Sequence, residues 1–287
     1  LWRALFRRER PPGYHLSKSF GQAVPDMAKR NGDTFRQSGQ SGQSVQPAES
    51  RRPGESAEAI SCRNLIKSFG DPPMPILKGI DLTIAAGEFV SLTGRSGSGK
   101  STLLYILSSL DEPTEGEVFL QGRSVHSLDS KEQHRFRNEH VGFVFQFHYL
   151  LPELTAVENV LMPTRKLGLH EKKREQAEHL LAEFGLDHCI NKLPSQMSGG
   201  EVQRCAIARS LIMDPDILFT DEPTGNLDTV NGDRVIEMFG RINKEQKTTI
   251  LMVTHDPDYA RAAGRQVHMV DGRIESDTKR AKSAKRR

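Results

Sequence analysis

An α/β fold built on a largely parallel sheet is the fold class that this sequence predicts. Two apolar runs, EFVSLTG at 88–94 and DILFTD at 216–221, have the length and composition of buried strands. Longer stretches separate such runs, and one of them, Glu171–Phe184, is rich in the helix formers Glu, Lys, Ala and Leu. Buried apolar strands that alternate with helices are typical of parallel sheets, and the predicted fold class follows from that alternation.

The length and composition allow one large domain or two small ones. The chain has 287 residues, of which 36% are hydrophobic and 27% charged, as in ordinary globular proteins. No apolar run approaches the roughly 18 residues that a membrane helix needs. We therefore expect another chain to supply any membrane span.

The positive charge is concentrated at the two ends of the chain. The formal net charge is +3, but residues 1–57 hold ten Lys or Arg against five Asp or Glu, and residues 276–287 hold six against one. The stretch 58–275 therefore carries a net charge of −7. An acidic folded part argues against a nucleic-acid-binding surface, so we expect no nucleic-acid partner.

Both ends are predicted to lie outside the folded domain, which we expect to span 58–275. Residues 1–57 are predicted to be a disordered N-terminal extension and linker, because 31–56 are rich in Gly, Ser, Gln and Pro. Met27 is an alternative start, and the opening LWRALFRRER could form a short amphipathic membrane anchor. Residues 276–287 are predicted to be a solvated basic tail, with attraction to anionic lipid as the alternative.

The three cysteines predict free thiols rather than disulfides or a metal site. Cys62, Cys189 and Cys205 are scattered, odd in number and lack the spacing of metal ligands. We expect them to be buried and reduced, as in a cytosolic protein.

The first chemical motif is a glycine-rich loop. Residues 94–101 fit the pattern GxxxxGK[ST], directly after the apolar strand at 88–93 and before a helical run from Thr102. In that setting backbone N–H groups converge on phosphate oxygens at a helix N-terminus, whereas a Gly/Ser-rich surface turn would lack these flanks. Lys100 would reach the β- and γ-phosphates, and Ser101 would bind Mg²⁺. The predicted ATP-binding residues of this loop are Gly94, Ser96, Gly97, Ser98, Gly99, Lys100, Ser101 and Thr102.

The second motif is an apolar strand that ends in two carboxylates, Asp221 and Glu222. Asp221 is predicted to help hold Mg²⁺, and Glu222 to accept a proton from an attacking water. On its own this could equally be a solvated acidic loop after a strand. The presence of the phosphate-binding loop favours the catalytic interpretation.

The segment from Ser198 to Arg204, SGGEVQR, opens a helical stretch and resembles the signature motif of ABC ATPases. In that family the motif contacts the ATP of a second subunit. The resemblance implies that Ser198, Gly199, Gly200 and Glu201 form this contact in trans, although the segment could also be an ordinary glycine-containing helix cap. Two positions depart from the family pattern: Met197 stands where Leu is usual, and Val202 stands where Gln or another polar residue is common.

Other family elements occur in the expected order. Gln146, in VGFVFQ, resembles the glutamine that senses Mg²⁺ and the nucleophilic water, and is a predicted Mg²⁺ ligand together with Ser101 and Asp221. His255, in MVTHD, resembles the histidine that contacts the γ-phosphate and positions Glu222. The same family resemblance assigns Asp228, in the NLD segment, to the loop that links the two sites of a dimer. It also assigns Phe69, in KSFG, to the aromatic that stacks on adenine, although a core position is nearly as compatible with that residue.

The resemblance covers roughly residues 60–275 and implies an architecture. It consists of a RecA-like phosphate-loop NTPase core that carries Asp221 and His255, an antiparallel β subdomain, and a helical subdomain over about 150–205 that carries the signature. The segment Phe147–Leu161 would form part of the groove that receives a permease.

Three longer runs restrict the resemblance to one group within the ABC ATPases. They are ENVLMP at 158–163, DEPTGNLD at 221–228 and LKGIDLTIAAGEFVSLTG at 77–94. They are similar to the LolD, MacB and FtsE group, which contains lipoprotein-release, macrolide-export and cell-division ATPases. This group implies an ATPase that forms a homodimer around two Mg-ATP and drives a permease. It would lie peripherally at the cytoplasmic face of the inner membrane and serve lipoprotein release or export.

Two alternatives remain for the function. One is an FtsE-like signalling ATPase that gates a cell-wall hydrolase. The other is a non-transport ABC ATPase of translation or DNA repair, which is disfavoured because the chain holds one set of motifs and no coiled-coil or zinc insertion.

Overall fold

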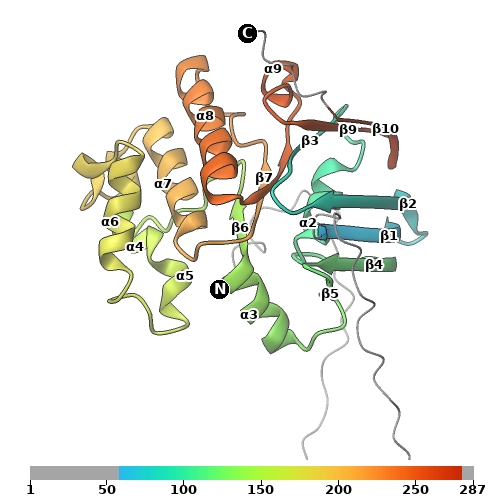
Figure 1. The fold of residues 1–287 in the computed structure, drawn as a ribbon, viewed down its shortest axis with the longest axis horizontal. Coiled ribbons are helices and arrows are strands. Elements are labelled where there is room, and N and C mark those ends of the chain that lie inside the picture. The colour runs from blue at the N-terminus through green and yellow to red at the C-terminus, as the bar shows by residue number, and fades with distance from the viewer. Residues whose placement is uncertain (1–57, 280–287) are drawn as a thin grey trace, which may run out of the picture. The chain divides into compact units, whose positions relative to one another are not determined.

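The computed structural model describes residues 58–279 of the chain (Figure 1). The predictions for the N-terminal extension and linker, and for residues 280–287 of the basic tail, lie outside the described residues. None of the helices within 58–279 combines the length and the apolar character that are needed to span a membrane.

A six-stranded sheet forms the centre of this part of the chain, in the order β10-β9-β3-β8-β7-β6. Its strands are β3 (Phe89–Gly94), β6 (Val141–Val144), β7 (Ile217–Asp221), β8 (Thr249–Val253), β9 (Arg265–Val270) and β10 (Arg273–Lys279). All neighbours pair in parallel except β9 and β10, which pair antiparallel. The predicted parallel sheet is confirmed, as are the strands predicted at 88–94 and 216–221.

The parallel strands bring the predicted chemical residues to one edge of the sheet. Val253 at the end of β8 pairs with Leu92 in β3 and with Asp221 in β7, and Val144 of β6 pairs with Thr220. The four strands therefore end close together, and the segments that follow them share that edge. Ligand sites of open α/β sheets form at the carboxyl ends of the strands.

Alternate residues along the strands enter two different cores, as the pleat of a strand requires. Leu218 and Met252 face a core that includes α7 (Gly199–Leu211) and α8 (Thr229–Gln246). Phe219 on β7 and its counterparts on β3 and β8 face the other core, which includes α2 (Lys100–Leu107). The helices α2 and α7 therefore cover opposite faces of the sheet.

A second sheet, in the order β2-β1-β4-β5, packs on the side of α2 and is antiparallel throughout (Figure 1). Its strands are β1 (Glu58–Phe69), β2 (Met74–Ala85), β4 (Glu115–Leu120) and β5 (Arg123–Ser124). This sheet is the antiparallel β subdomain that the family resemblance implied.

The remaining helices lie mainly between β5 and β7 in the chain. They are α3 (Ser130–His140), α4 (Ala156–Val160), α5 (Met162–Arg165), α6 (Arg174–Glu183), η1 (Asp187–Cys189), η2 (Pro194–Gln196) and, after β8, α9 (Pro257–Ala260). Figure 1 shows α4, α6 and α7 grouped on the side of the fold away from the antiparallel sheet. The helix α7 continues beyond residue 205 to Leu211 because its apolar side chains are part of the first core.

The ordered structure also continues past 275, where we predicted the folded domain to end. The strand β10 runs to Lys279 and pairs with β9. Arg265 holds it there, since its guanidinium donates to both carboxylate oxygens of Asp277 at 2.7 and 2.6 Å and to Glu88 at 2.9 Å. Residues 276–279 are polar, and their composition alone predicted a tail. The residues that pair with them lie elsewhere in the chain, so the local sequence did not indicate a strand.

Candidate active site

The loop between β3 and α2 has the backbone geometry of a phosphate cradle. Gly94 and Gly99 have φ values of 145° and 97°, a region that side chains rarely occupy. A side chain at Gly94 would also overlap the backbone oxygen of Met269 at the end of β9. The loop therefore needs glycine at both ends, and its N–H groups lead directly into the first turn of α2.

Polar groups inside this loop are suited to an anion. The Lys100 ammonium lies across the loop and donates to the backbone oxygens of Gly94 at 3.0 Å and Arg95 at 2.9 Å. The Ser98 hydroxyl is buried and has no hydrogen-bond partner among the described residues. A phosphate oxygen would accept from both groups, so the residues present fit the predicted ligand.

Asp221 faces the first turn of α2 from the end of β7. Its carboxylate accepts hydrogen bonds from the Ser101 hydroxyl at 3.1 Å and from the Tyr105 hydroxyl at 2.9 Å. Burial raises the pKa of Asp221, and the two hydrogen bonds oppose that shift. Hydroxyl and carboxylate oxygens are ligands that Mg²⁺ prefers, so Ser101 and Asp221 fit the predicted metal.

Tyr105 is a residue of the site that the sequence analysis missed. It lies one helical turn after Ser101, and side chains at this spacing share a helix face. That spacing was the signal that could have revealed it.

Glu222 is held in a strained conformation beside His255. Its φ is +46°, in the left-handed region, and its backbone N–H donates to Val253 at 3.0 Å. The Glu222 carboxylate accepts hydrogen bonds from Nδ1 of His255 at 2.9 Å and from the His255 backbone N–H at 3.4 Å. Local strain of this kind is concentrated at functional sites. The structure thus brings together the predicted base and the predicted orienting histidine.

Gln146 lies at the same edge, after β6, with an exposed side chain. Its backbone oxygen accepts a hydrogen bond from the Asn226 side chain at 3.2 Å. The loop that follows β6 is therefore linked to the loop that follows β7, which leads to Asp228.

The signature segment forms a capped helix start. Ser198 is the N-cap of α7: its hydroxyl accepts from the Glu201 N–H at 3.4 Å, and the Glu201 carboxylate accepts from the Ser198 N–H at 2.6 Å. Ser198 and Gly199 are exposed, whereas Glu201 is mostly buried. The hydrogen bonds to the Ser198 N–H and then to His188 lower the pKa of Glu201 to about 2. Glu201 therefore caps the helix within its own chain, and its contact with ATP in trans stays a prediction.

Hydrogen bonds connect the signature helix, α7, to the edge of the sheet that carries Asp221 and Glu222, which we call the catalytic edge. Gln203 is buried and donates to the Pro223 oxygen at 2.7 Å, directly after Glu222. Arg204 donates at 3.0 Å to Asn231, whose own N–H donates at 2.8 Å to Asp228, the N-cap of α8. The signature helix α7 nevertheless packs on the face of the sheet opposite α2, the helix that follows the phosphate-binding loop.

Comparisons with known proteins place the chain in a family. A family model described as "ABC transporter" matches residues 77–225, more than half of the chain. The chain belongs to the ABC transporter family. More specifically, it is an ATP-hydrolysing subunit of an ABC transporter, and the fold class predicted from the sequence is confirmed.

Individual relatives agree with this family. The lipoprotein-releasing system ATP-binding protein LolD of Leptospira interrogans is 52% identical over 217 residues, which are 76% of this chain and 91% of LolD. The protein of the same name from Aquifex aeolicus is 53% identical over 219 residues, 76% of this chain and 96% of its own length. A dimeric structure of the ATP-binding cassette MJ0796, bound to ADP and Pi, has a TM-score of 0.72 and 38% identity and covers 78% of this chain and 99% of its own.

A partly buried arginine of this ABC ATPase supports the segment after Gln146. The Arg209 guanidinium, on α7, donates to the backbone oxygens of Tyr149 at 2.6 Å and His148 at 2.7 Å. Burial lowers its pKa to about 10, so it stays charged at neutral pH. Arg209 was not predicted from the sequence, where a lone cation in the apolar run CAIARSL was the available signal.

Phe69 ends β1 at the hairpin that borders the phosphate-binding loop. The Lys67 ammonium lies 4.8 Å from the centre of the Phe69 ring. Lys67 pairs with Leu77 on β2, and Leu77 and Ile76 pack directly against Gly99. This position is compatible with a contact to a nucleotide base, and stacking of Phe69 on adenine stays a prediction.

The capping role of Glu201 gives the first testable prediction. Glu201→Gln should keep the reciprocal cap and lose only the charge, whereas Glu201→Ala should cost about 1–2 kcal/mol in unfolding free energy. The pKa of Glu201 is lowered from 4.5 to about 2, so its charge stabilises the fold fully above pH 4.5 and less as the pH falls. Between pH 7 and pH 4 the advantage of wild type over Glu201→Gln should shrink by at most about 0.8 kcal/mol.

Urea unfolding at the two pH values, with a chelator present, measures this difference. Glu139→Gln on α3 is the control, since Glu139 pairs with exposed Arg135. A difference between wild type and Glu201→Gln that does not change with pH would contradict the lowered pKa.

Proposed function

We propose that this ATPase works as a homodimer around two Mg-ATP and drives a permease for lipoprotein release, peripherally at the cytoplasmic face of the inner membrane. The observation that carries the proposal is that Lys100, Asp221 and Glu222 lie at one edge of the sheet. The signature helix packs on the face of the sheet opposite α2, so its start would be available to a second copy. The names of the LolD relatives and the dimeric MJ0796 structure support the substrate class and the dimer.

The nucleotide and its ion would be held by groups of one chain. The loop N–H groups and Lys100 would bind the phosphates, and Ser101, Asp221 and Gln146 would hold Mg²⁺. The ion supplies positive charge that neutralises the phosphate oxygens. Glu222 would accept the proton of the attacking water, and the 2.9 Å hydrogen bond from His255 fixes the direction of that carboxylate.

The second copy would complete each site. Exposed Ser198 and the N–H groups of Gly199 and Gly200 start a helix, and a helix N-terminus favours a phosphate. Asp228 lies at the start of α8, linked through Asn231 to the signature helix, so both motifs would move together at the dimer interface. A monomer would bind ATP through Lys100 and hydrolyse it poorly.

The segment Phe147–Leu161 would receive the permease. Phe147 is 57% exposed, directly after Gln146, and Arg209 fixes the residues behind it. A large exposed aromatic residue on a supported loop is typical of a contact surface. Its position after Gln146 would connect the permease to the catalytic edge.

Co-purification tests the proposed partner. The chain should co-purify with a membrane permease that has a large periplasmic domain, and Phe147→Ala should weaken that complex by at least about tenfold. Met74→Ala is the matched control, because Met74 is 67% exposed on the antiparallel sheet instead. Recovery with ribosomes or DNA in place of a permease would contradict the transport role.

A further inference from the structure

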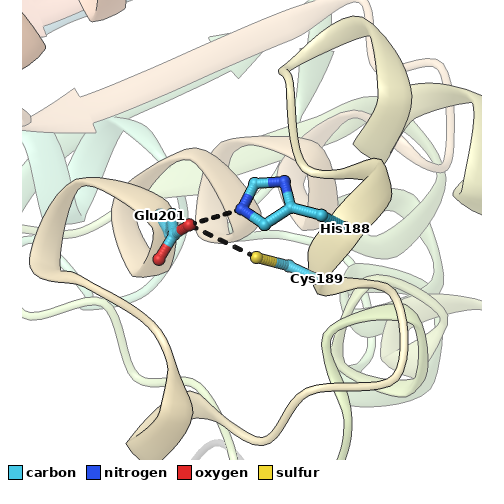
Figure 2. A group of neighbouring side chains, drawn as sticks. All are labelled: His188, Cys189 and Glu201. Carbon is cyan, nitrogen blue, oxygen red and sulfur yellow. Dashed lines mark hydrogen bonds and ion pairs between the residues drawn. The ribbon is translucent and has the colours of Figure 1, made fainter.

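We propose that His188, Cys189 and Glu201 form a binding site for a zinc-type divalent metal ion, separate from the nucleotide site. One ligand atom of each side chain lies within 4.8 Å of the other two. Figure 2 shows the imidazole and the thiol, from η1, both directed at the Glu201 carboxylate at the start of α7.

The distances are close to those of an occupied site. Oε1 of Glu201 lies 2.7 Å from Nε2 of His188 and 3.4 Å from Sγ of Cys189. A tetrahedral zinc ion with bonds of about 2.0–2.3 Å separates its ligands by about 3.3–3.8 Å. Sγ of Cys189 and Oε1 of Glu201 already meet this spacing, whereas the His188 ring has to turn so that Nε2 moves away from Oε1 and stays within reach of Sγ, which lies within 4.8 Å of it.

The proposed site combines one ligand that can move with two ligands that are held in place. The His188 side chain is 51% exposed, so it can shift without disturbing the core. Cys189 is fully buried, and Oε2 of Glu201 is fixed by the Ser198 N–H at 2.6 Å. Two ligands are therefore preorganised, and the third can adjust.

The donor set selects the metal. One nitrogen, one sulfur and one carboxylate oxygen are ligands of zinc, whereas Mg²⁺ takes oxygen ligands. On binding, the Cys189 thiol releases its proton to solvent and its sulfur bonds to the ion. The thiolate and the Glu201 carboxylate then balance the two positive charges, and water takes the fourth position.

A hollow of about 530 Å³ is lined in part by His188 and gives an ion access to that imidazole. Charges of both signs line it, namely those of Arg174, Glu178, Asp187 and Lys192. Burial and then the Glu201 carboxylate raise the pKa of the Cys189 thiol, and the nearby Lys192 charge opposes that shift.

The sequence alone did not reveal this group. The spacing of the three cysteines suggested no metal site, because a search by spacing compares Cys189 only with the other cysteines. The structure adds the neighbouring His188 and a Glu twelve residues further along, which packing of η1 against α7 brings together.

Metal binding to the untagged full chain tests the proposal, with excess Mg²⁺ and no nucleotide. Calorimetry with Zn²⁺ should find a site with one ion per chain, and Co²⁺ should give the absorption of a cobalt–thiolate bond. Cys189→Ser and His188→Gln should each weaken Zn²⁺ binding at this site by at least about tenfold. At a hundredfold excess over Kd, Zn²⁺ should raise the Tm of wild type by about 5 °C and that of His188→Gln by much less.

Matched controls isolate the site. Cys62→Ser changes another buried free thiol, and His179→Gln changes an imidazole that is 74% exposed beside Glu183. Both variants should bind Zn²⁺ as wild type does. A cobalt–thiolate band that survives in Cys189→Ser, or Zn²⁺ binding that neither Cys189→Ser nor His188→Gln weakens, would overturn the proposal. These readouts do not depend on ATP turnover.

Discussion

Replacing Glu222 by Gln should lower the rate of ATP hydrolysis by about 10²–10⁴-fold and leave ATP binding intact. The amide has the size of the carboxylate and can still accept the hydrogen bond from His255, which is 2.9 Å long in the wild type. It cannot accept the proton of the attacking water. The γ-phosphate should then persist between two copies, so the variant should elute as an ATP-bound dimer in size-exclusion chromatography.

The control for this variant is Asp216→Asn, since Asp216 pairs with His140 at the opposite end of β7 from Glu222. It removes a carboxylate from the same part of the chain and should keep wild-type turnover. Steady-state phosphate release compares the two variants. Unchanged turnover in Glu222→Gln would refute the assignment of this residue as the base.

Much of the site could be predicted because its chemistry lies at the ends of buried strands. Apolar runs mark β3, β7 and β8, and in a parallel sheet their carboxyl ends have to meet. Lys100, Asp221 and His255 therefore come together from segments that are far apart in the chain. The rule depends only on strand direction, which the alternation of strands and helices already indicates.

Other features depend on packing that no local pattern records. The strained backbone of Glu222, the contact of Arg209 with Tyr149 and the cap formed by Glu201 each depend on packing with residues that the local sequence does not identify. Residues 276–279, the last part of β10, were predicted to belong to a basic tail for the same reason, since Arg265 is the partner that binds Asp277 there. The structural roles of these residues are set by tertiary contacts, which local sequence composition does not record.

Changing Gly199 to Ala should disable hydrolysis by about 10²-fold without disturbing the folded chain. A side-chain carbon at Gly199 meets no atom within 4 Å, and alanine forms helices better than glycine by about 0.5–1 kcal/mol. Its methyl group would occupy the space that a phosphate of the second copy needs. The variant should therefore bind ATP through its own Lys100 and fail only at the interface.

Mixing this variant with Lys100→Ala separates action in trans from action in cis. A mixed dimer has one complete site, made from the loop of the Gly199→Ala chain and the signature of the Lys100→Ala chain. ATP turnover of the mixture should therefore rise well above that of either variant alone. Gly240→Ala is the matched control, since Gly240 is another helical glycine with no atom within 4 Å of an added carbon, and it should stay active. If the mixture gains no activity, the site does not draw on a second copy, because only a shared interface lets two defective chains restore each other.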